Sequence, residues 1–186
     1  MQQEISNSLE ILKNGKVFLY PTDTVWGIGC DATDVSAVNK VFEIKKRPES
    51  KSLIILVDSL KMLQKYVLKI PSSVLDILEN TKTPTTIIYK NPIQLASNVI
   101  ASDNTVAIRI VQNEFCKQLI NQFKKPIVST SANISGSPTP KSFKEIEQPI
   151  LDSVDYIVNL QREAINDKSS TILKVEENGE ILVLRK

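Results

Sequence analysis

The hydrophobic and polar positions of this chain follow two periods in turn, which predicts alternating helices and strands. Ile5, Leu9 and Leu12 share one helical face before Asn14-Gly15, and a short apolar run at 16–20 predicts a strand. Further on, apolar residues at helical spacing predict helices, and compact apolar runs predict strands. The predicted helices span 34–46, 59–67, 72–80 and the region around 115–123, and the predicted strands span 53–57, 85–90, 105–111, 127–129, 154–160, 171–175 and 181–184.

Several short-range signals mark where these elements begin and end. Asp34 is a suitable N-cap for the second helix, and Pro48 disfavours helix at the residue before it. Lys45 falls on the apolar face of this helix, at its C-terminal end. Ser142 and Glu145 have the spacing of a capping box, which predicts a further helix there.

The last two strands are predicted to pair around Asn178-Gly179, a strong signal for a two-residue hairpin turn. Counting outwards from that turn sets Ile172 opposite Arg185 and puts Ser170 on the same face as Arg185. We therefore expect Ser170 and Arg185 to be neighbours.

The order of elements favours one α/β domain over residues 1–186, with a twisted mixed sheet flanked by helices. Helices and strands alternate, yet the hairpin and long loops argue against a doubly wound parallel sheet. The 186 residues, of which 41% are hydrophobic, can form one sizeable core. No internal repeat, linker or low-complexity tract divides the sequence.

Composition excludes several kinds of chemistry. There is no histidine, so His-based metal sites, Ser-His-Asp triads and imidazole proton shuttles are excluded. The net charge of +2 identifies no partner. Cys30 and Cys116 lie in apolar contexts, which favours reduced core thiols. No apolar run reaches the ~18 residues of a membrane span and no secretory signal is visible, so we expect a cytoplasmic protein that does not enter a membrane.

The stretch 44–57, IKKRPESKSLIILV, places a cluster of cations directly before an apolar strand. Lys45, Lys46, Arg47 and Lys51 lie between the end of a predicted helix and the start of a buried strand. Backbone amides and fixed cations at such a junction suit a phosphate chain. An isolated cluster of this kind is more often a solvated turn, so the stretch alone does not decide the function.

Two polar loops could add to a phosphate site. PTDTVWGIG at 21–29 and STSANISGSPTP at 129–140 each follow a predicted strand. Hydroxyl groups and backbone N–H groups in such loops can surround phosphate oxygens. The second loop lacks the ending of a Walker loop and the glycine spacing of a dinucleotide fold. Each loop alone is also compatible with an ordinary polar surface loop.

An arginine stands in the otherwise apolar strand 105–111. The alternation of this strand puts Thr105 and Arg109 on one face. A buried arginine is costly without an anionic partner. Either a structural carboxylate or the carboxylate of a ligand would satisfy it.

Taken together and in this order, five stretches resemble the YrdC-like threonylcarbamoyl-AMP synthase family, in its short, single-domain form. They are YPTDTVWGIGCDA, IKKRPESKSLIILV, TVAIRIV, STSANISGSPTP and SSTI, and they span nearly the whole chain. The resemblance implies the YrdC/RibB-like α/β fold with a concave basic surface. The family signature of lysine-x-arginine, lysine and serine-x-asparagine appears as Lys45-x-Arg47, Lys51 and Ser131-x-Asn133.

The resemblance also implies a reaction. L-Threonine captures bicarbonate as a carbamate, which attacks the α-phosphate of ATP to give threonylcarbamoyl-AMP and pyrophosphate. Mg²⁺ would accompany ATP, and no protein metal ligand is implied. A downstream transferase complex would then pass the threonylcarbamoyl group to an adenosine in tRNA, and the domain itself could bind tRNA or double-stranded RNA.

The resemblance assigns roles to individual residues. The residues implied in catalysis are Lys45, Arg47 and Lys51. Those implied in ATP binding are Arg47, Lys51, Thr105, Ser131, Asn133, Thr139 and Arg185. Those implied in threonine binding are Thr24, Arg109, Ser129 and Ser170.

The sequence departs from the family pattern in three places. Ser52 stands where the family commonly has proline after the lysine of the basic loop, and Trp26 replaces a usual tyrosine. The stretch 81–84, TKTP, stands where a tryptophan-proline-glycine-proline turn usually precedes the central strand. The loss of that rigid turn bears on the shape of the pocket more than on the fold.

Three other functions fit parts of the pattern. A non-catalytic module of the same fold could bind double-stranded RNA or tRNA on its basic surface. The carbamoyl-transfer domain of hydrogenase-maturation proteins is related, but those chains carry paired cysteines for zinc fingers. Dihydroxybutanone-phosphate synthase shares the fold, but its site relies on histidine.

Overall fold

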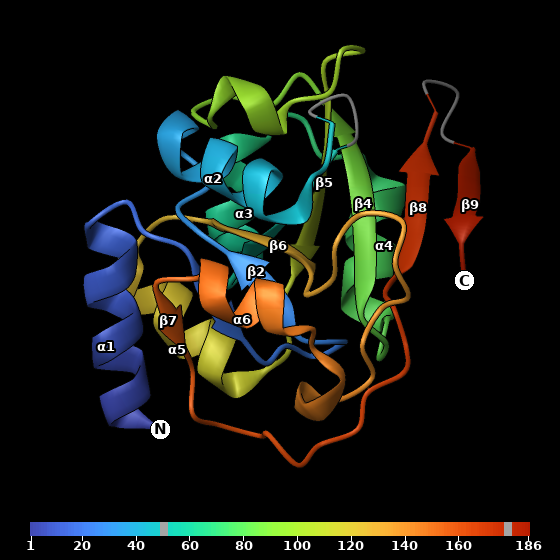
Figure 1. Cartoon of the computed structure of the whole chain (residues 1–186). Helices are drawn as coiled ribbons and strands as arrows, with labels where there is room; N and C mark the ends of the chain where they lie inside the picture. The colour runs from blue at the N-terminus through green and yellow to red at the C-terminus, as the bar shows by residue number, and fades with distance from the viewer. Residues whose placement is uncertain (49–51, 177–179) are drawn as a thin grey trace.

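A single mixed sheet forms the centre of the molecule (Figure 1). The computed structural model describes residues 1–48, 52–176 and 180–186. Over these residues the strands lie in the order β7-β1-β2-β6-β3-β5-β4-β8-β9. Their bounds are β1 Phe18–Tyr20, β2 Gly27–Gly29, β3 Ile54–Val57, β4 Thr85–Lys90, β5 Thr105–Ile110, β6 Ile127–Ser131, β7 Tyr156–Ile157, β8 Thr171–Val175 and β9 Ile181–Arg185.

The pairing of the strands confirms a mixed sheet. The pairs β1–β7, β3–β5 and β4–β8 are parallel, whereas β1–β2, β2–β6, β3–β6, β4–β5 and β8–β9 are antiparallel. Parallel neighbours need long crossover connections, and helices supply most of them. The predicted single α/β architecture is therefore correct.

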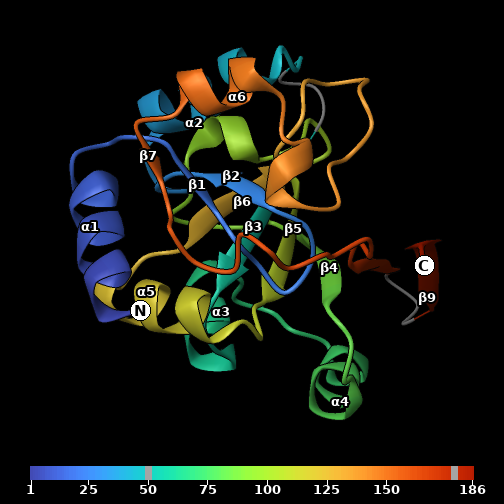
Figure 2. The same ribbon diagram turned by 60° about the horizontal axis from the view of Figure 1, so that its bottom comes forward.

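Helices cover both faces of the sheet. Figure 2 shows α2 and α6 on one side of the strands and α3, α4 and α5 on the other. None of the helices in the described part of the chain is long and apolar enough to cross a membrane. Their bounds are α1 Gln2–Lys13, α2 Val35–Lys45, α3 Leu60–Tyr66, α4 Ser72–Asn80, α5 Glu114–Phe123 and α6 Gln148–Ser153, with 3₁₀ turns at η1 Ser97–Val99 and η2 Phe143–Glu145.

The end of α2 sets the direction of the basic stretch that follows. The Asp34 side chain caps the first turn and accepts hydrogen bonds from the backbone N–H groups of Ser36 (2.9 Å) and Ala37 (3.1 Å). At the other end, Lys46 adopts the left-handed conformation with φ of 48°, which terminates the helix. The chain then turns so that Arg47 leaves the helix axis.

The core lies between the sheet and its helices and comes close to the cavity described below. Tyr20 is fully buried, stacks on Phe18 with ring centroids 4.5 Å apart, and donates a hydrogen bond to the Val128 carbonyl. Its ring occupies the space above Gly29, where an added Cβ would lie 2.6 Å from the ring. The glycine in β2 thus makes room for the aromatic pair.

Two predicted elements were wrong. Ser142 makes no side-chain capping bond, and Glu145 instead accepts a hydrogen bond from the backbone of Lys141, so only the short turn η2 forms there. The strand expected at 154–160 is reduced to β7, which pairs only with β1 among the described strands, at the edge of the sheet. In contrast, β6 is longer than predicted and runs on to Ser131.

The terminal hairpin reaches the predicted pair by a different register. Val175 pairs with Ile181, one residue out of step with the register that a turn at Asn178-Gly179 would impose. A bulge beside Ile172 then restores the step, so that Ile172 does lie opposite Arg185. That pair is confirmed, the register over the rest of the hairpin was wrong, and the predicted turn lies outside the described residues.

Candidate functional site

A cavity of about 340 Å³ lies on one face of the sheet and crosses strands from β2 to β9. Its volume falls within the ~300–1,000 Å³ of common ligand pockets. Its lining combines apolar residues, such as Ile54, Ile88 and Ala107 of the central strands, with arginines and hydroxyl groups. The predicted site residues among its lining are Thr24, Arg47, Arg109, Ser129, Ser131, Thr139, Ser170 and Arg185.

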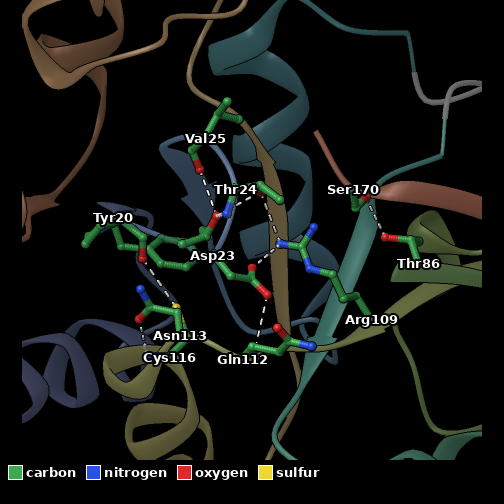
Figure 3. A network of polar contacts seen from close by, with 12 residues as sticks. Tyr20, Asp23, Thr24, Val25, Thr86, Arg109, Gln112, Asn113, Cys116 and Ser170 are labelled. Carbon is green, nitrogen blue, oxygen red and sulfur yellow. Dashed lines mark hydrogen bonds and ion pairs between the residues drawn. The ribbon is translucent and has the colours of Figure 1, made fainter. Parts of the chain in front are cut away.

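Arg109 reaches this cavity from β5 and has a carboxylate partner inside the protein. One terminal nitrogen of its guanidinium lies 2.9 Å from Asp23 Oδ1 and donates a longer bond to the Thr24 hydroxyl, as Figure 3 shows. Asp23 also accepts from the Gln112 backbone N–H at 3.0 Å. Both members of the ion pair are nearly inaccessible to water. Of the two partners considered for Arg109, the structural carboxylate is thus present.

Arg109 nevertheless retains unused hydrogen-bonding capacity. Its Nε is buried and has no hydrogen-bond partner among the described residues. A guanidinium offers five donors, and Asp23 and Thr24 occupy only one of its nitrogens. A buried donor without a partner is costly, so a ligand that accepts from it would bind favourably.

Ser170 and Arg185 form a second wall of the cavity. The Arg185 guanidinium donates to the Ser170 carbonyl (3.0 Å) and to its hydroxyl (3.1 Å), which confirms that the two are neighbours. The Ser170 hydroxyl also lies 2.8 Å from that of Thr86 on β4 (Figure 3). Partial burial and the nearby charge of Arg109 lower the pKa of Arg185. The close approach of two arginines favours an anionic ligand between them.

The basic stretch contributes Arg47 to the cavity. Its guanidinium donates to the Ser52 carbonyl at 2.9 Å, and burial lowers its pKa. Ser52 and Leu53 line the cavity beside it. Lys51, which the sequence places in the same group, lies outside the described residues.

Three predicted site residues do not line the cavity. Thr105 shares the strand face of Arg109, but it begins β5 and donates its hydroxyl proton to Asp103. Asn133 lies beneath the loop after β6, where its amide nitrogen bonds the carbonyls of Ile134 and Ser137. Lys45 is 1% exposed and turns inwards.

Lys45 joins the end of α2 to the loop that follows β6. Its ammonium donates to the carbonyls of Ser131 and Asn133, and its own carbonyl accepts from the Ser135 backbone N–H. This arrangement holds the serine-x-asparagine segment against the basic stretch. Its contacts are therefore those of a group that shapes the site, whereas the family resemblance implied a role in catalysis.

Burial of the Lys45 ammonium, together with the charge of Arg47, lowers the pKa of Lys45 to about 8. In the unfolded chain the pKa of lysine is ~10.4, so between these values the unfolded state binds more protons and stability rises with pH. We expect the free energy of unfolding to rise by ~2 kcal/mol between pH 7 and 9.5 relative to Lys45→Met. Urea unfolding of the wild type and of Lys45→Met between pH 7 and 9.5 measures this difference in the free energy of unfolding. Titrating groups that the two proteins share cancel in the difference. A difference that is constant with pH would contradict the buried ammonium.

Some residues at or beside the cavity were not assigned to the site from the sequence. Asp23 lies within the predicted polar loop. Because a buried arginine needs an anionic partner, the sequence did contain a signal that could have suggested the ion pair between Asp23 and Arg109. Trp26, the only tryptophan, lines the cavity and packs on Phe143 at 5.0 Å between ring centroids. Leu184 lines the cavity from β9, where only the irregular register brings it inwards.

The fold and the cavity together define an α/β protein with a pocket whose arginines suit an anionic ligand. The sequence identifies the family more specifically. The Sua5/YciO/YrdC family model, described as "Telomere recombination", matches residues 10–186. This chain therefore belongs to the Sua5/YciO/YrdC family.

Individual relatives resemble the chain over its whole length. A threonylcarbamoyl-AMP synthase of Pseudoalteromonas translucida is 34% identical over 183 residues, which cover 97% of either chain. The solved structure of an H234A/Y235A variant of P. abyssi Sua5 is 27% identical, with a TM-score of 0.90. P. abyssi Sua5 in complex with L-threonine is also 27% identical, with a TM-score of 0.89. All of this chain is covered in both, but it spans only 56% and 54% of those Sua5 chains.

Proposed function

We propose that this protein is an L-threonylcarbamoyladenylate synthase, which converts L-threonine, bicarbonate and ATP to threonylcarbamoyl-AMP and pyrophosphate. The observation that carries the proposal is the cavity in which Arg47, Arg109 and Arg185 converge on one face of the sheet. The name of the relative from P. translucida and the threonine bound to P. abyssi Sua5 support this reaction.

The reaction needs alignment and neutralisation of charge more than covalent help from the protein. The amine of threonine forms a C–N bond with bicarbonate, water leaves, and a carbamate results. A carbamate oxygen then attacks the α-phosphorus of ATP while the bond to the β-phosphate oxygen breaks, so pyrophosphate leaves with the electron pair. Such nucleotidyl transfer is accelerated mainly by positioning and by fixed positive charge.

The lining of the cavity offers groups suited to both substrates. We assign the carboxylate of threonine to Arg109, whose unpartnered Nε and planar guanidinium suit bidentate binding. Thr24, Ser129 and Ser170 would surround the amino acid. Arg47 and Arg185, with Lys51, Ser131 and Thr139, would bind the nucleotide.

Mg²⁺ would enter with ATP as part of the substrate. The described residues contain no group of three or more His, Cys, Asp or Glu residues that could hold a metal ion. Phosphate oxygens and water commonly supply most ligands of Mg²⁺ at nucleotide sites. We therefore assign its coordination to the triphosphate.

The product would serve tRNA modification. A mixed anhydride of a carbamate and AMP is an activated donor, so a transferase must consume it by attack of an amino group, here that of an adenosine in tRNA. We place this protein at the first step, with the downstream tRNA threonylcarbamoyl transferase complex as its partner. Direct binding of tRNA by the concave basic surface that the family resemblance implies is a separate proposal.

Release of pyrophosphate tests the proposed reaction. Purified protein with ATP, Mg²⁺, bicarbonate and L-threonine should release pyrophosphate well above a control without threonine. Each other amino acid, added in turn, tests the assignment of threonine. Release that does not depend on an amino acid would contradict the reaction, and no release together with retained RNA binding would support the RNA-binding alternative.

A further inference from the structure

The hydroxyl of Thr86 lies next to the cavity without lining it. Thr86 is fully buried on β4, whereas Ser170, which its hydroxyl contacts, is part of the lining. In the register of the sheet Thr86 lies opposite Arg109 of β5, and paired residues of neighbouring strands share a face. Ile88, two residues further along β4, lines the cavity from that face. The roles assigned above make no use of Thr86.

The buried position of Thr86 determines which of the two hydroxyls donates to the other. A hydroxyl has one proton to donate and two lone pairs that accept. The Thr86 hydroxyl has no hydrogen-bond partner among the described residues other than that of Ser170, 2.8 Å away (Figure 3). If Ser170 donated, the Thr86 proton would be left without an acceptor in a fully buried position, which is costly. Thr86 is therefore the donor and Ser170 the acceptor.

The proton of the Ser170 hydroxyl is then left for the cavity. The Ser170 oxygen accepts from the Arg185 guanidinium at 3.1 Å and from Thr86, so both of its lone pairs are in use. Arginine has no acceptor to offer in return. Because Ser170 lines the cavity, only a ligand or solvent can accept its proton.

We propose that Thr86 is a positioning residue for the amino-acid substrate: it holds the Ser170 hydroxyl as a donor to the carboxylate of threonine. In the reaction proposed above, on which this inference rests, Arg109 binds that carboxylate, and Thr86 lies opposite Arg109 in the sheet. A hydroxyl oxygen with both lone pairs in use cannot accept from the ammonium of threonine, so Ser170 selects the carboxylate end. The bond from Thr86 also polarises the Ser170 O–H group and strengthens its donation.

Thr86→Val tests this role, because it removes the hydroxyl and keeps the shape of the side chain. Titration with threonine alone, followed by the fluorescence of Trp26, should show affinity lowered ~3- to 10-fold, as expected for one hydrogen bond. Affinity for ATP should stay within about twofold of the wild type. Thr86→Ser keeps the hydroxyl and should bind threonine like the wild type.

Thr85→Val is the matched control on the same strand. The Thr85 hydroxyl donates to the Thr83 carbonyl, and its side chain lies on the opposite face of β4 from that of Thr86. This variant loses a hydroxyl of the same kind and should bind both substrates like the wild type. Thermal unfolding verifies that each variant is folded.

A double-mutant cycle distinguishes action through Ser170 from a general weakening of the sheet. In a Ser170→Ala background, Thr86→Val should cost no further affinity for threonine, because no hydroxyl remains to be positioned. Additive losses would contradict the role of Thr86, as would a Thr86→Val variant that binds threonine normally. A loss seen only with bicarbonate and ATP present would overturn the assignment to the carboxylate and favour a carbamate oxygen. A wild type that binds no threonine overturns the proposed function as well, so the two failures are distinguishable.

Discussion

Replacement of Arg109 by alanine is expected to abolish most of the affinity for threonine while affinity for ATP changes little. Arg109 lines the cavity, is paired with Asp23, and has a buried Nε with no hydrogen-bond partner among the described residues. Loss of one partner of a buried, hydrogen-bonded charge pair costs ~2–5 kcal/mol, so we expect affinity for threonine to fall ~30- to 5,000-fold. Titration of both substrates, with the fluorescence of Trp26 as the signal, measures the two affinities separately.

Truncation of Arg109 also leaves Asp23 as a buried charge, which can destabilise the fold. Arg109→Lys keeps a positive charge near Asp23 but loses the planar fork, so it should fold and still bind threonine weakly. Arg162→Ala removes an arginine that stacks on Phe143 outside the cavity lining and serves as a control. Equal losses for ATP and threonine in Arg109→Lys would contradict the assignment of Arg109 to the amino acid.

Replacement of Arg47 by alanine is expected to reduce affinity for ATP while affinity for threonine changes little. The Arg47 guanidinium is fixed by the Ser52 carbonyl at the edge of the cavity, where it can neutralise a phosphate. A hydrogen bond to a charged group contributes ~1.5–3 kcal/mol, so affinity for ATP should fall ~10- to 150-fold. Affinity for threonine, measured in the absence of nucleotide, should stay within about twofold of the wild type.

The neighbouring cation provides the matched control for Arg47. Lys46 is exposed, ends α2 and does not line the cavity, so Lys46→Ala removes the same charge from almost the same place in the sequence. If positive charge attracted ATP only in a general way, Arg47→Ala and Lys46→Ala would lose similar amounts of ATP affinity. That attraction would also weaken as the salt concentration rises. If Arg47 contacts ATP directly, Arg47→Ala should bind ATP much more weakly than Lys46→Ala does at physiological ionic strength.

Much of the fold could be predicted because local signals and the hydrophobic pattern agree. The helix at 72–80 and the strand at 85–90 have the predicted bounds, since each is set off by turn residues such as Pro71 and Pro84. The capping box at Ser142 failed because the chain turns after a single 3₁₀ turn, and no amphipathic stretch follows to extend a helix. A short motif without a periodic pattern behind it is a weak prediction.

The position of the site was predicted in outline, but the sequence did not show which of its residues line the cavity and which lie behind it. Residues grouped by family motif proved to line one cavity, but Lys45 and Asn133 of those motifs support the loops from beneath. Whether a long side chain points into a pocket or under it depends on tertiary packing, which the sequence pattern does not specify. The pairing of Asp23 with Arg109 joins segments far apart in sequence, so no local rule could place it.

The cavity takes its walls from the loop at Thr24 and from β9 at Arg185, nearly the two extremes of the sequence. Contacts of such long range form late in folding, because a large loop must close before they stabilise anything. During synthesis on the ribosome the nascent chain would therefore carry no complete cavity until β9 had emerged. A chain interrupted before β9 would lack Arg185 and, with it, one wall of the cavity.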